Sequence, residues 1–69
     1  LPSDPDELLA WIRSQAMQRD VDESALVAWC QSKPRIWLQP SQKSLENLSM
    51  LGRKKLAAAM DKAVAEIGG

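Results

Sequence analysis

The sequence predicts an all-α fold, a compact orthogonal bundle of four helices, or five with a short extra turn. Two features carry this prediction: apolar residues recur every three or four positions along most of the chain, and no segment alternates apolar with polar residues as a half-buried strand would. A chain of 69 residues has room for one hydrophobic core. Residues 1–69 are therefore expected to form a single helical domain, and the start at Leu1 suggests a piece excised from a larger protein.

The first helix is expected over residues 5–18 or 5–19. Asp4 suits the position before a helix and Pro5 suits the first helical position, while Glu7 has the spacing of a capping box. Apolar side chains then follow at helical spacing and predict the buried face: Leu8, Leu9, Ile12 and Ala16, with Trp11 beside them.

The second helix is expected over residues 23–32, with Asp22 as its N-terminal cap. Pro34 forces the residue before it out of helical geometry and therefore ends this helix. The segment 33–40 then places three large apolar residues between two prolines: Ile36, Trp37 and Leu38. We expect an irregular connector, or one helical turn, whose apolar side chains fill the core.

The last third of the chain predicts two further helices. The third begins at Ser41 or Ser44 and runs to Leu51. Gly52 would then end it in the left-handed conformation. The fourth covers residues 53–67 and carries an apolar stripe: Leu56, Met60, Ala63, Val64 and Ile67. The alternative is one helix through Gly52, at a cost of about 1 kcal/mol relative to alanine.

Residues that usually carry catalysis or hold a cofactor are missing. The chain has no histidine and Cys30 is its only cysteine, so neither an activated thiol nor a zinc cluster can be built. The acidic residues gather at predicted helix starts, where capping explains them. We therefore predict a non-catalytic domain with no cofactor and no metal site. No apolar run approaches the ~20 residues that span a bilayer, so we expect no membrane partner and a cytoplasmic location.

The charge of the chain is zero in sum but unevenly distributed. Residues 1–23 hold six acidic and two basic side chains, a net charge of −4, and residues 24–69 hold three acidic and seven basic ones, a net charge of +4. One end of the molecule is thus expected to be acidic and the other basic. Because a dedicated nucleic-acid domain is usually basic overall, nucleic-acid binding should be weak or confined to one part of the surface.

Basic residues mark the strongest candidate site. The stretch from Gly52 to Lys55 places three bases at a predicted helix start, where local rules favour acids, and such exceptions often mark function. We predict a nucleic-acid-binding surface made of six bases: Lys33, Arg35, Lys43, Arg53, Lys54 and Lys55. Trp37 is the candidate for stacking on a base or anchoring a protein partner. The alternatives are that the bases form a solvated face and that Trp37 fills the core.

The order of these segments resembles the HRDC domain, the helicase-and-RNase-D C-terminal module. Three segments carry the resemblance: LLAWIRSQA (8–16), LVAWCQSKP (26–34) and LENLSMLGRKKL (45–56). The resemblance implies a helical bundle appended to a RecQ-type DNA helicase or to a nuclease of DNA recombination and repair. It also implies an auxiliary contact with single-stranded or structured DNA, for which the turn from Gly52 to Lys55 carries over.

Two functions compete on these grounds. The first is weak, salt-dependent binding of single-stranded or structured DNA in support of a parent helicase or nuclease. The second is a protein docking or oligomerisation module, in which the oppositely charged ends and the apolar cluster at 36–38 make the contact. A small regulatory protein, such as an antitoxin or a plasmid factor, is a third alternative. Bases that converge beside an exposed Trp37 would favour DNA, whereas dispersed bases and an exposed apolar patch would favour a protein.

Overall fold

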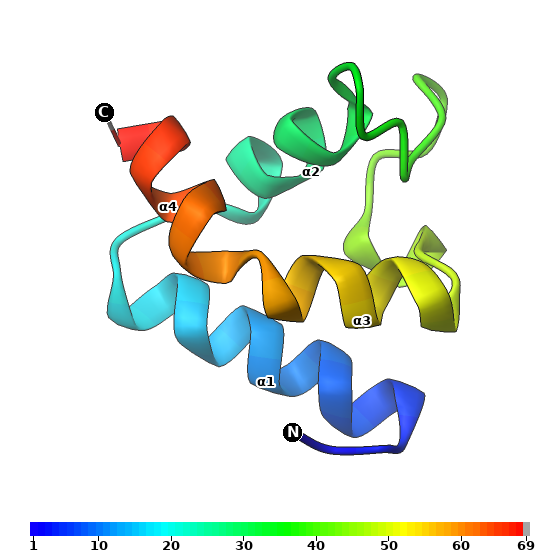
Figure 1. Ribbon diagram of the computed structural model, residues 1–69, viewed down its shortest axis with the longest axis vertical. Helices are drawn as coiled ribbons and strands as arrows, with labels where there is room; N and C mark the ends of the chain where they lie inside the picture. The colour runs from blue at the N-terminus through cyan, green and yellow to red at the C-terminus, as the bar shows by residue number, and fades with distance from the viewer. Residues whose placement is uncertain (69) are drawn as a thin grey trace.

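Four α-helices and one short 3-10 turn form the fold of residues 1–68, the part of the chain that the computed structural model describes, and these residues contain no strand. The elements are α1 (Pro5–Gln18), α2 (Glu23–Gln31), η1 (Leu45–Asn47), α3 (Met50–Ala58) and α4 (Met60–Gly68). The predicted all-α class is confirmed. α1 and α3 lie side by side and run in the same direction, and α2 packs against α4 at the top of Figure 1.

α1 begins and ends close to the predicted residues. The side chain of Asp4 accepts hydrogen bonds from the backbone N–H groups of Asp6 and Glu7, which have no partner inside the helix. The predicted apolar face is buried: Leu8, Leu9, Ile12 and Ala16. Asp20 then adopts a left-handed conformation with φ 56° and turns the chain into α2.

α2 follows its prediction with two differences. It ends at Gln31, one residue early, and the Asp22 side chain makes no capping hydrogen bond although the residue holds the cap position. The connector that follows α2 is irregular, as expected. It is held in place by the Cys30 carbonyl, which accepts hydrogen bonds from the backbone N–H groups of Trp37 and Leu38. Of the three apolar residues expected to fill the core, Leu38 is fully buried, Trp37 is partly buried, and Ile36 stays 51% exposed.

The predicted third helix ending at Gly52 is wrong. Only a 3-10 turn forms at Leu45–Asn47, because Leu48 is extended and Ser49 caps a new helix. The Ser49 Oγ accepts a hydrogen bond from the backbone N–H of Gly52, with the two atoms 3.0 Å apart. Gly52 therefore lies in the first turn of α3 and does not have a positive φ. A Cβ at this position would lie 3.1 Å from the end of the Leu48 side chain, so a larger residue would require Leu48 to shift slightly.

The predicted fourth helix over 53–67 is also corrected, because it is divided into α3 and α4. Ala59 leaves helical geometry between them, and its N–H is shared by the Lys55 and Leu56 carbonyls. Alanine is the best helix former, so local propensity does not explain the break. The change of direction places α4 against α2, where Trp29 donates a hydrogen bond to Glu66. Tertiary packing therefore overrides propensity at this point.

Candidate functional site

Arg53 is part of the interior and does not belong to the predicted nucleic-acid surface. The residue is 8% exposed, and its guanidinium donates three hydrogen bonds to main-chain carbonyls: Leu48 (3.2 Å), Pro5 (2.7 Å) and Glu46 (3.0 Å). These bonds join the start of α1 to η1 and to the start of α3. The expectation that Arg53 faces a phosphate is thus corrected, because its donors are already occupied by the fold.

Arg35 is likewise held by the fold. Its Nε donates to the Trp29 carbonyl at 2.9 Å, and its Nη2 donates to Ser32 Oγ at 2.7 Å. The guanidinium carbon lies 3.8 Å from the Trp29 ring centre, and Glu66 lies 3.6 Å from Nη2. With 16% of its side chain exposed, Arg35 has little surface left for a nucleic acid and is corrected in the same way as Arg53.

Trp37 is a half-buried packing residue. Its ring meets the buried Trp29 ring edge to face, with centroids 5.5 Å apart and planes at 73°. Trp29 in turn donates from its indole nitrogen to Glu66 Oε1 at 2.9 Å. Trp37 thus holds the connector against α2, and the interpretation that it fills the core fits the structure better than that of a free stacking platform.

The four remaining predicted bases are lysines, and all are exposed: Lys33, Lys43, Lys54 and Lys55. Within residues 1–68, each of the four arginines approaches a carboxylate within 4.0 Å, whereas none of the five lysines does. The basic side chains without an ion pair in this part of the chain are therefore all lysines.

Two of these lysines lie on one exposed face of α3. Positions 51, 54, 55 and 58 have the spacing of a single helix face, and all four are exposed. Leu51 is 62% exposed and is the one large apolar side chain on this face. We refer to this surface as the α3 outer face: Leu51, Lys54, Lys55 and Ala58.

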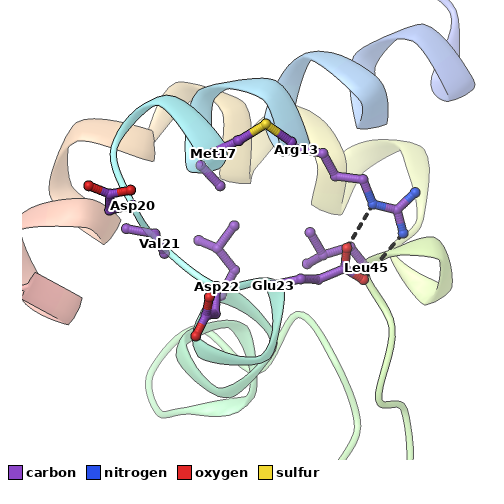
Figure 2. A pocket seen from close by; sticks show the side chains of 9 residues that line it. Arg13, Met17, Asp20, Val21, Asp22, Glu23 and Leu45 are labelled. Carbon is purple, nitrogen blue, oxygen red and sulfur yellow. Dashed lines mark hydrogen bonds and ion pairs between the residues drawn. The ribbon is translucent and has the colours of Figure 1, made fainter.

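An open pocket of about 430 Å³ lies between the end of α1 and the start of α2 (Figure 2). We call it the α1–α2 pocket, and its lining is mixed: Arg13, Ala16, Met17, Asp20, Val21, Asp22, Glu23, Leu26 and Leu45. Leu26 and Leu45 lie beneath the pocket and are completely buried, so they expose no surface of their own. The exposed apolar surface of the pocket comes mainly from Met17, which is 78% exposed, and from the partly buried Val21.

One end of this pocket is closed by an ion pair. Arg13 donates from Nε to Glu23 Oε1 at 2.8 Å and from Nη2 to Oε2 at 3.2 Å, as Figure 2 shows. The hydrogen bonds from Arg13 hold the pKa of Glu23 below its ordinary value, and the same contact raises the pKa of Arg13.

The other end carries unbalanced negative charge. Asp20 and Asp22 line the pocket on the α1–α2 turn, both are exposed, and neither takes part in an ion pair within residues 1–68. The acidic character of residues 1–23 was visible in the sequence, but the pocket was not. It depends on the left-handed turn at Asp20 and on Leu45, which arrives from a distant segment.

Cys30 is fully buried, and burial raises the pKa of its thiol to about 11. A thiol in this state is a small core side chain and not a nucleophile. Within residues 1–68, no group of three or more His, Cys, Asp or Glu side chains is arranged to hold a metal ion. The helices described are also too short and too polar for any of them to cross a membrane.

Comparison with known protein families, with curated proteins and with solved structures found no match to this chain.

Proposed function

We propose that this chain is a non-catalytic helical module that binds a protein partner. The observation that carries the proposal is the α1–α2 pocket, a concave surface that combines the exposed Met17 with carboxylates of Asp20 and Asp22 that form no ion pair within residues 1–68. A concave surface with apolar and charged side chains together is typical of a binding site.

The distribution of the bases supports a protein partner over a nucleic acid. Two of the six predicted bases, Arg35 and Arg53, donate to groups of the fold itself, and Trp37 packs on Trp29. What remains is a set of lysines spread from the end of α2 to α3 in a chain whose net charge is zero. An electrostatic nucleic-acid site needs a concentrated positive surface.

The test is a selection of displayed peptides on the immobilised chain, followed by titration of the enriched peptides in solution. If the enriched peptides bind in the pocket, Met17→Ser should lower their affinity for the chain at least tenfold, because the substitution removes the exposed apolar side chain at the pocket edge. Gln18→Ser is the matched control, since Gln18 is the exposed neighbour on α1 that does not line the pocket. No enrichment, or equal losses in the two variants, would contradict the proposal.

A second candidate function is weak binding of single-stranded or structured DNA, which the exposed lysines without ion pairs favour. Titration of labelled single-stranded DNA at two salt concentrations tests it, because each phosphate contact adds to the salt dependence. Lys54→Ala with Lys55→Ala should lower the affinity and flatten the salt slope. An unchanged titration would exclude this function. The wider expectation from the HRDC resemblance, a domain of a cytoplasmic RecQ-type helicase or of a nuclease, stays a prediction.

A further inference from the structure

We propose that the α1–α2 pocket binds a second copy of this chain, which inserts the outer face of its α3. This inference rests on the proposed function and names the partner. It follows from two surfaces of one molecule that are opposite in charge and that both expose an apolar side chain.

The receiving surface combines exposed apolar side chains with negative charge. Met17 and the partly buried Val21 supply the apolar part, and the pocket volume of about 430 Å³ is sufficient for a leucine side chain. Asp20 and Asp22 at the edge have no cation within reach among residues 1–68. A cation brought by the partner would therefore find carboxylates that the fold has left unpaired.

The inserted surface has the opposite properties. Leu51 projects an exposed apolar side chain, and Lys54 and Lys55 follow it by three and four positions, on the same face. Ala58 completes the face with a small side chain, which lets another surface approach the helix closely. α3 itself is held in place by the three carbonyl bonds of Arg53, so this face is presented on a fixed element.

The two surfaces share no residue, so one molecule can use both at once. The contact is then head to tail, and successive copies form a closed ring or an open filament, depending on the rotation between them. The negative charge of Asp20 and Asp22 and the positive charge of Lys54 and Lys55 would favour this orientation over one in which two like surfaces meet. No third component is required.

Two variants, each with the charge of one surface reversed, test the inference. Their self-association is measured by sedimentation velocity over a range of concentrations. The basic-side variant is Lys54→Glu with Lys55→Glu, and the acidic-side variant is Asp20→Lys with Asp22→Lys. Each variant carries like charges on both surfaces and should self-associate at least tenfold more weakly than the original chain. In a mixture, each pocket meets a face of opposite charge, so association should return.

Charge reversal could disturb folding, and far-UV circular dichroism would show this. A pair of smaller substitutions in the pocket then provides the test. Asp20→Asn with Asp22→Asn keeps residues that tolerate the turn and the cap position, and it should still weaken association. Glu7→Gln is the control, because Glu7 is an exposed acid on α1 that lies outside the pocket. Self-association of the original chain should also weaken between about 10 mM and about 100 mM salt, as the Debye length falls from about 30 Å to about 10 Å.

A chain that stays monomeric at millimolar concentration and low salt would overturn the inference, as would a mixture of the two charge variants that does not associate. The proposed function has a separate outcome. If selected peptides bind and respond to Met17→Ser while the chain stays monomeric, the pocket serves another protein. If neither is observed, both proposals fail.

Discussion

Replacement of Arg53 by alanine should destabilise the fold severely, although the residue lies in a stretch of three bases that resembles a surface patch. Its guanidinium donates to three main-chain carbonyls, and 8% of the residue is exposed. A hydrogen bond from a charged donor contributes about 1.5–3 kcal/mol. Three such bonds, taken at the lower value because neighbouring bonds are not additive, correspond to about 4.5 kcal/mol.

That loss is large relative to the stability of so small a domain. For a chain of 69 residues the free energy of unfolding is expected to be about 3–10 kcal/mol. Arg53→Ala should therefore leave the chain partly or wholly unfolded at room temperature. Arg53→Lys should recover part of the stability, since one ammonium keeps the charge but cannot reach three carbonyls in the fork geometry of a guanidinium.

Urea denaturation followed by far-UV circular dichroism measures these differences. Lys62→Ala is the control, because it removes an exposed lysine from a helix and should change the free energy of unfolding by less than about 0.5 kcal/mol. If Arg53→Ala lost less than about 1 kcal/mol, the carbonyl bonds would not hold the fold as argued.

Three further predictions concern strain, burial and charge. Ile36→Gly should stabilise the fold by about 1 kcal/mol, because a β-branched residue at φ 49° is strained, whereas Ile36→Val should bring no gain; a denaturation midpoint below that of the original chain would refute this. Cys30 should resist a thiol reagent at about pH 8 in the folded chain and react quickly once the chain is unfolded, and equal rates in both states would contradict its burial and its raised pKa. The lowered pKa of Glu23 means that the Arg13–Glu23 contact stabilises the fold above the ordinary glutamate pKa of 4.5 and is lost as the pH falls through the lowered value. Both side chains are more than a third exposed, so Glu23→Gln should lower the free energy of unfolding by no more than about 1 kcal/mol. The variant should also lose less stability than the original chain between about pH 7 and about pH 3. An unchanged pH dependence would refute this prediction.

The sequence was most informative where local chemistry decides the structure. The cap at Asp4 and the apolar stripe of α1 are determined by neighbours within one or two helical turns, and both were predicted with the correct residues. The same local spacing places Cys30 on the inner face of α2, four positions after Leu26, and both residues are fully buried.

The burial of Arg53 follows from its helical spacing to apolar residues later in the sequence. It lies three and four positions before Leu56 and Ala57, and both are buried, so Arg53 occupies the inner stripe of α3. Lys54 and Lys55 fall outside that stripe and are exposed. The three consecutive bases therefore do not form one surface patch. A helical register through position 53 would have predicted one buried base and two exposed ones.

Other features could not have been predicted from local sequence. The end of η1 and the start of α3 depend on Ser49 rather than on Gly52, and both residues are credible helix boundaries. The α1–α2 pocket needs Leu45 beside Leu26, an arrangement that only the packed chain defines. The break at Ala59 occurs in the part of the chain with the highest helix propensity, so long-range packing alone accounts for it.

Arginine and lysine have different roles in this fold, and the difference has a consequence for chemical modification. Arg35 and Arg53 supply the hydrogen bonds that hold the fold, whereas the five lysines are exposed and form no ion pair within residues 1–68. Acetylation neutralises lysine and leaves arginine untouched. The chain could therefore lose the charge of every lysine, and become strongly anionic, with its helices and core unchanged.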